Sequence, residues 1–205
     1  MDGFKRRKEH SKAQIRQAAQ ELFSHFGVDK VSMTDIAKKA GVSQATIYNN
    51  FGSKEALARD FVTAMVEGLV RRAVEIVESE RSYQEKMTAF FQFISAMMAD
   101  GRPSSLGSAV FTSNLDIQND AEIKEIRIKA QDQMIALLLR LIEEGKEQGQ
   151  VDEQFSAEAL RIYFKAFMDI FVDHQFQQQF ARNRNLVNEM SLLMLHGLSG
   201  GRRLG

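Results

Sequence analysis

The stretch that decides the fold is residues 31–54, VSMTDIAKKAGVSQATIYNNFGSK, which reads as two short helices joined by a tight turn. Ser32 is followed by Asp35 three residues later, which is the spacing of a capping box at the start of a helix. Gly41 stands where a left-handed residue ends that helix, and Ser43 can cap the second one. The pattern predicts a helix-turn-helix, the motif that lays its second helix in the major groove of DNA.

The second helix carries no charge over residues 43–51, although a solvated surface helix is usually rich in Lys and Glu. Only Ile47 points plainly inward, and the outer surface consists of amides, hydroxyls and one Ala. Gln and Asn bond adenine bidentately, Ala contacts the thymine methyl, and hydroxyls suit phosphate oxygens. A polar helix that merely shields its own core is the weaker alternative. We expect DNA contacts from Thr34, Ser43, Gln44, Ala45, Thr46, Tyr48, Asn49, Asn50 and Lys54.

Residues 11–60 contain a series of short motifs whose order and spacing are typical of one family of proteins. They are Phe26-Gly27, the helix of residues 33–40, Gly41-Val42-Ser43, Thr46-Ile47-Tyr48, Phe51 and Ser53-Lys54-Glu55-Ala56-Leu57. Together they resemble the TetR (tetracycline repressor) family. The resemblance implies an all-α fold, with an N-terminal three-helix helix-turn-helix domain and a larger C-terminal helical domain for ligand binding and dimerisation. Gln44-Ala45 and Asn50 depart from the Lys-Gly and His of many members, so the operator sequence cannot be inferred.

The charge distribution agrees with two domains. Residues 1–54 hold ten Lys and Arg against five Asp and Glu, whereas residues 55–205 hold seventeen against twenty-two. A basic head on an acidic body suits a DNA-binding domain over residues 1–54 and a ligand-binding and dimerisation domain over residues 55–205. A chromatin-compacting DNA binder would need basic charge along the whole chain. With no Cys, no secretory signal and no apolar run of membrane length, we expect a cytoplasmic protein without a membrane partner.

The first helix of the head is expected to begin at the cap Ser11, with Gln14 at capping-box spacing. Ahead of it, residues 5–8 form a basic arm, KRRK, that either lies along DNA phosphates or enters a minor groove, or else is a disordered tail. One helical stripe should close the core, and Phe23 falls beside that stripe. The stripe consists of Ile15, Ala18, Ala19, Leu22 and Phe26.

Beyond residue 54 the pattern is helical and strand signals are absent. The expected helices cover about residues 54–79, 82–98, 105–114, 120–148, 156–178 and 185–196. The last two are apolar on more than one face, so they need cover on more than one side. The resemblance implies that they form a homodimer interface, and two-fold symmetry would match a palindromic operator in double-stranded DNA.

The body contains eleven Phe and eight Met beyond residue 60, but no Trp. Met and Phe can line an adaptable pocket, although ordinary core is the simpler interpretation for any one residue. The candidate ligand-binding residues are Phe93, Met97, Phe111, Asn114, Met134, Leu138, Phe164, Phe167 and Met168. We expect a repressor released by an apolar or amphipathic small-molecule inducer. The alternative is a regulator that is ungated or controlled by a protein partner.

An enzyme is the rival class. The four histidines, at positions 10, 25, 174 and 196, are scattered along the chain. The sequence contains no HExxH, GxSxG, GxxxxGK[ST] or GxGxxG motif. We therefore expect no catalysis, no cofactor and no metal site.

Overall fold

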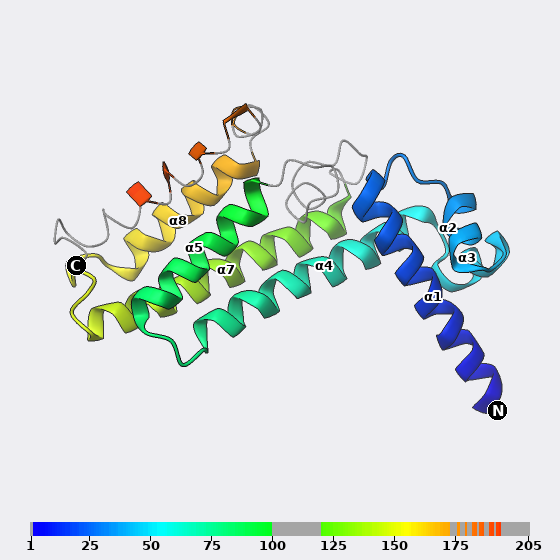
Figure 1. Ribbon diagram of the computed structural model, residues 1–205, viewed down its shortest axis with the longest axis horizontal. Coiled ribbons are helices and arrows are strands. Elements are labelled where there is room, and N and C mark those ends of the chain that lie inside the picture. The colour runs from blue at the N-terminus through cyan, green and yellow to red at the C-terminus, as the bar shows by residue number, and fades with distance from the viewer. Residues whose placement is uncertain are drawn as a thin grey trace. The chain divides into compact units, whose positions relative to one another are not determined.

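The computed structural model describes residues 2–99 and 120–172, together with isolated positions between 176 and 193. Every regular element in these residues is a helix, as the sequence predicts (Figure 1). The helices are α1 (Asp2–Phe26), α2 (Met33–Ala40), α3 (Gln44–Phe51), α4 (Lys54–Val77), α5 (Tyr83–Ala99), α7 (Ala121–Glu147) and α8 (Ala157–Val172). No helix in this part of the chain is long and apolar enough to cross a membrane.

The helix boundaries agree closely with the expected ones for α2 to α5 and for α7, which start within one residue of the cap signals. The expected helix over residues 105–114 lies outside the described residues, as does most of the one over 185–196. The described chain separates into two compact units. The first contains residues 2–66 and 120–127, and the second contains residues 67–99 and those from 128 onward.

Helix α1 begins well before the predicted cap. It runs from Asp2, so Ser11 lies in the helix interior and the basic residues 5–8 belong to its first turns. The prediction of a start at Ser11 is therefore wrong. Residues 4–10, FKRRKEH, contain Lys, Arg and Glu and neither Gly nor Pro. Such residues favour helix, and nothing in the sequence stops it from extending past a capping pair.

The core of the first unit corrects one predicted side chain. Phe23, placed beside the stripe, is fully buried, whereas Phe26, placed within it, is 49% exposed. Phe23 packs edge-to-face on Phe61 of α4 with ring centroids 5.4 Å apart. Phe26 is the last residue of α1, and its ring contacts the neighbouring His25 ring edge-to-face instead. The α1 stripe is therefore broader than predicted, and it ends one turn earlier.

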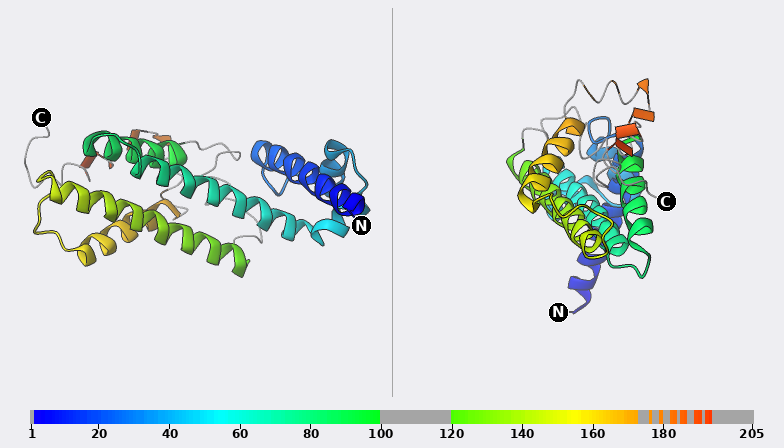
Figure 2. Two further views of the ribbon diagram at one scale, coloured as in Figure 1. Left: turned by 90° about the horizontal axis from the view of Figure 1, so that it is seen from below. Right: turned by 90° about the vertical axis from the view of Figure 1, so that its left-hand side faces the viewer.

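The second unit is held by contacts between α7 and its neighbours. At the start of α5, the buried ring of Tyr83 lies so close to Gly145 of α7 that a Cβ there would stand 2.5 Å from the ring. Burial raises the pKa of Tyr83 to about 12. One turn further on, Lys86 pairs with Glu144 at 3.1 Å. Figure 2 shows α7 alongside α4. Arg140 of α7 pairs with Glu78, the residue just after the end of α4, at 3.2 Å.

Candidate nucleic-acid interface

Helix α2 is fixed at both ends by the residues that the sequence indicated. The Ser32 side chain accepts from the Asp35 backbone N–H, and the Asp35 carboxylate accepts from the Ser32 N–H at 2.9 Å. Hydrogen bonds from Ser32 also hold the pKa of the Asp35 carboxyl below its ordinary value. Gly41 ends the helix with a φ of 67°, a conformation that costs glycine little. The predicted helix-turn-helix geometry is present.

Helix α3 presents two different faces. Ile47 is fully buried and anchors the helix to the core, whereas Tyr48 is 48% exposed. Gln44, Ala45 and Asn49 are also exposed. The outward surface of α3 is therefore uncharged and consists of amide, phenol and methyl groups. Amide and methyl groups are among those that contact base edges in the major groove.

Four of the predicted contact residues form two hydrogen-bonded pairs around the start of α3. Ser43 caps the helix by accepting from the Thr46 backbone N–H at 3.1 Å, and the two hydroxyls lie 2.8 Å apart. Gln44 donates its amide to the hydroxyl of Thr34 on α2. This bond leaves the Gln44 carbonyl oxygen and one N–H for a partner. Hydrogen bonds to Thr34 of α2 and within α3 thus fix the first turn of α3 before DNA binds.

Asn50 and Lys54 are placed differently from the exposed residues. Asn50 is half-buried, donates to the Thr46 carbonyl at 2.7 Å, and has a buried side-chain oxygen without a hydrogen-bond partner. Lys54, also half-buried, donates to the Asp29 carbonyl at 3.4 Å. The Lys54 ammonium retains two further N–H groups for a phosphate. The Asn50 side chain, by contrast, lies partly beneath the exposed residues of α3.

Cations on α1 hold that helix against the end of α3. Lys12 and Arg16 lie over the Phe51 ring, 5.7 and 5.9 Å from its centroid. The Arg16 guanidinium also makes a two-pronged ion pair with Asp60 of α4, at 2.8 and 2.5 Å. Arg16 therefore connects three helices and fixes the orientation of α3. The sequence pattern did not reveal this role, because it depends on contacts between residues up to 44 positions apart.

Residues 15–61 match the sequence model described as "Bacterial regulatory proteins, tetR family". This part of the chain belongs to the TetR family. The match covers the capped helix pair, the start of α4 and the α1 residues that pack on them. The protein is a DNA-binding transcriptional regulator of the helix-turn-helix type.

Similarity to known proteins extends beyond this region. An uncharacterized HTH-type transcriptional regulator, YhgD of Bacillus subtilis, is 23% identical over 90% of this chain and 95% of its own. The nucleoid occlusion factor SlmA of Vibrio atlanticus is 28% identical over 86% of this chain and 91% of its own. The solved structure of the regulator FadR from Bacillus subtilis, in complex with stearoyl-CoA, shares the fold with a TM-score of 0.61. That structure is 22% identical and covers 93% of this chain and 98% of FadR.

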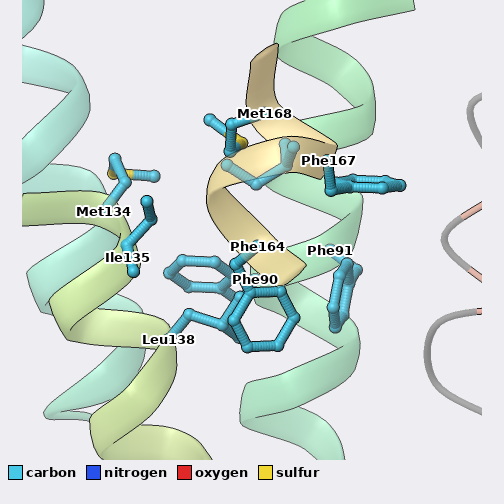
Figure 3. Close-up of a pocket in the computed structure, with 9 residues that line it drawn as sticks. Phe90, Phe91, Met134, Ile135, Leu138, Phe164, Phe167 and Met168 are labelled. Carbon is cyan, nitrogen blue, oxygen red and sulfur yellow. The ribbon is translucent and has the colours of Figure 1, made fainter. Parts of the chain in front are cut away.

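The second unit contains a small apolar cavity of about 20 Å³ (Figure 3). Five predicted ligand-binding residues line it: Met134, Leu138, Phe164, Phe167 and Met168. Phe90, Phe91, Ile94 and Ile135 complete the lining. Helix α7 contributes three of these side chains, and the others come from α5 and α8, as Figure 3 shows.

The other predicted pocket residues are not brought to this cavity. Phe93 is half-buried on α5 and is not among the lining residues. The Met97 side chain, Phe111 and Asn114 lie outside the described residues. Phe90, Phe91 and Ile94, which do line the cavity, were not among the predicted ligand-binding residues. Their helical spacing is the same for a solid core and for a pocket wall, so no local signal separates the two roles.

Proposed function

We propose that this regulator binds one palindromic operator as a homodimer in the cytoplasm and represses transcription there. The observation that carries the proposal is the exposed surface of α3, where Gln44, Ala45, Tyr48 and Asn49 present base-compatible groups without a single charge. Contacts to phosphates favour any DNA sequence equally, whereas amide contacts to base edges distinguish base pairs. In the proposal, all the residues predicted to contact DNA do so, although Asn50 is half-buried beneath the exposed residues of α3.

Gln44→Ala should weaken binding to the preferred duplex by about 1–3 kcal/mol and leave binding to random DNA nearly unchanged. The Gln44 amide is held by Thr34, so its contact with a base costs little further ordering. The measurement is a fluorescence titration with the tightest duplex selected from a random library, alongside a scrambled duplex.

Two variants serve as controls for Gln44→Ala. Gln17→Ala removes an exposed amide from α1, where Gln17 bonds only within its own helix to Glu21, and should leave both affinities unchanged. Thr34→Val removes the acceptor that orients Gln44 and should weaken binding to the preferred duplex more than binding to the scrambled one. Equal losses on both duplexes for Gln44→Ala would remove the base-reading role.

Apolar residues on α8 support the proposed homodimer. Leu160 and Phe164 are buried in the unit, whereas Ile162 and Tyr163 of the same helix are 65% and 50% exposed. A helix with apolar residues on a solvent-facing side requires a partner to cover it. A second copy of the chain fits, because two readers held on a two-fold axis double the number of base contacts.

The proposed inducer is an apolar or amphipathic small molecule that enters the cavity of the second unit. A void of about 20 Å³ holds roughly one water molecule, so a ligand must displace the Phe and Met side chains around it. Met134 and Met168 are suited to this, because thioether side chains repack at low cost. FadR, which shares the fold, holds stearoyl-CoA, and an acyl chain has the chemistry that this lining accepts.

Helix α4 offers the route by which such a ligand would act. It begins at the reader and ends in the second unit, so a displacement of its later residues reaches α3 through a continuous element. Within the first unit, Arg59 of α4 pairs with Asp120 at 2.7 Å and with Glu122 at 3.2 Å, which ties α4 to the start of α7. The ligand must favour the conformation that cannot bind the operator, since equal affinity for both states shifts nothing.

Stearate serves as a probe of the gated mechanism. At about a hundredfold excess over its Kd it should raise Tm by about 5–10 °C and release the operator. Met134→Phe should abolish both effects while leaving operator affinity intact, because a larger ring fills the cavity. The matched control is Leu137→Phe, a change on the same helix at a half-buried residue that does not line the cavity.

The second candidate is a regulator that is ungated or controlled by a protein partner. The size of the described cavity favours it, since no ligand larger than water fits without rearrangement. An unchanged operator affinity and an unchanged Tm across a series of fatty acids, acyl-CoA thioesters and steroids would support this alternative over the gated repressor.

A further inference from the structure

A polar contact between α7 and α8 lies beside the apolar cavity of the second unit. The Gln131 side chain on α7 donates to the Asp169 carboxylate on α8, with 2.9 Å between the nitrogen and the oxygen. The Lys165 ammonium, one turn earlier on α8, donates to the other oxygen of that carboxylate at 3.3 Å. None of these three residues is among those that line the cavity.

This contact lies just outside one end of the cavity. Figure 3 shows Met134 of α7 and Met168 of α8 toward the same end of the lining, whereas Leu138 lies toward the other end. Gln131 is therefore on the outer side of Met134, about 4.5 Å further along the axis of α7. Asp169 follows Met168 directly on α8. The hydrogen bond between Gln131 and Asp169 thus joins α7 to α8 immediately beyond the two methionines.

The side chains at this end of the cavity are the ones that can move. Met134 and Met168 line it with unbranched thioether side chains, which repack at low cost. The side chains of Lys165 and Asp169 are 57% and 51% exposed, so both can turn into water while their helix stays folded. Gln131 is half-buried and remains between the helices. An amphipathic ligand whose tail displaces the methionines leaves its polar end beside Gln131.

The donors at this contact suit an acidic group. The Gln131 amide and the Lys165 ammonium donate to the two oxygens of one carboxylate, which is the arrangement that an acid head group requires. A cationic head group fits less well, because the Asp169 carboxylate is already paired with Lys165 and a second cation there would meet that ammonium. Asp169 therefore occupies, from within the chain, the position that the carboxylate of a ligand needs.

We propose that the inducer is an amphipathic carboxylic acid whose head group displaces Asp169 and binds to Gln131 and Lys165. The inference rests on the proposed inducer cavity and names the chemical class of its ligand. One carboxylate replaces another in the exchange, so both donors stay satisfied while Asp169 turns into water. Because the displaced carboxylate stays nearby and repels the incoming one, Asp169 lowers the affinity for acids and leaves the affinity for neutral compounds unchanged.

The test compares dodecanoate with 1-dodecanol, which has the same carbon chain without the charge, by calorimetric titration of the full chain. Asp169→Ala should bind dodecanoate about fivefold more tightly than the wild type, which is the factor for removing a like charge about 4 Å away in water. Lys165→Gln should bind dodecanoate about fivefold less tightly, because it removes an opposite charge at a similar distance. Neither substitution should change the affinity for 1-dodecanol.

Two further variants isolate the effect of the Asp169 charge. Asp169→Asn keeps an acceptor for Gln131 without the charge, and it should also bind dodecanoate more tightly. Glu158→Ala is the matched control, since it removes a carboxylate from the same exposed side of α8. Glu158 lies about 16 Å from Asp169 along the helix axis, beyond the screening length of about 8 Å at physiological salt, so both affinities should equal those of the wild type. Circular dichroism should report the same helix content for every variant.

Failure of the head-group site and failure of the cavity give different results. If the wild type binds both compounds and Asp169→Ala changes neither affinity, the cavity stands and the head-group site is wrong. Equal gains for both compounds would show that Asp169 only holds the cavity closed, and weaker binding of dodecanoate would make Asp169 part of the binding site. Either result overturns the displacement. If neither compound binds to the wild type or to Asp169→Ala, the inducer cavity itself is wrong, and the head-group site with it.

Discussion

Phe23→Ala is expected to lower the free energy of unfolding of the first unit by about 3–5 kcal/mol. The Phe23 side chain is fully buried and packs edge-to-face on Phe61, so truncation leaves a void lined by α1 and α4. Because these contacts also position the helix-turn-helix, operator binding should weaken in step with the folded fraction. Urea titration followed by circular dichroism, with hydrogen exchange of α1 amides, measures the change in this unit.

Phe26→Ala is the matched control, since it removes the same ring from the same helix three residues later. Phe26 is 49% exposed, and the expected cost is below about 1 kcal/mol. Adding Phe61→Ala to each variant separates the pair interaction, which should be about 0.5–1.5 kcal/mol for Phe23 and near zero for Phe26. Equal costs for Phe23→Ala and Phe26→Ala would contradict the packing described here.

The sequence predicted the helix-turn-helix well because its signals are local. The capping box of Ser32 and Asp35, the left-handed Gly41 and the cap Ser43 act within a few residues of their own positions. The all-helical class and the bounds of α4, α5 and α7 followed from caps and periodicity in the same way. None of these features needs knowledge of a distant partner.

Features set by distant contacts were predicted less well. The angular position of Phe26 on α1 is as favourable for burial as that of Ile15, but the helix ends there and no partner lies beyond it. Phe23 is buried because Phe61 lies opposite, and that residue is 38 positions away in the sequence. The role of Arg16 likewise depends on which helices meet. The helical periodicity of a sequence shows which residues share a face of one helix, but it does not show which other helix packs against that face.

The proposed dimer surface on α8 is defined by the positions of its residues around the helix and by their exposure. Ala159, Ile162, Tyr163 and Ala166 fall within about a third of the helix circumference, and all four are exposed. They carry no charge, unlike the exposed Glu158, Arg161 and Lys165 on the neighbouring side. Leu192 and Leu193, further along the chain, are 53% and 72% exposed. Stable interfaces bury about 800 Å² on each partner, and such apolar surface supplies their central part.

Charge placed on this stripe should give monomers that no longer select the operator. Ile162→Glu, alone and combined with Leu193→Glu, puts carboxylates where the partner helix must exclude water. A monomer contacts one half-site, so operator affinity should fall by about a thousandfold or more, towards the non-specific level. Multi-angle light scattering and operator titration measure the two effects, and the helix content should be unchanged because both side chains are exposed in the single chain.

Ala157→Glu is the control for this substitution, since it adds the same charge at an exposed residue of α8 that lies about 140° away from Ile162 around the helix. Glu at the first position of a helix is also compatible with the helix dipole, so the variant should fold and remain dimeric. A wild-type protein that is monomeric at micromolar concentration and yet binds the operator tightly would exclude the dimer. A dimer that survives both glutamates would instead move the interface away from this side of α8, since two buried carboxylates without partners cost more than such an interface can offset.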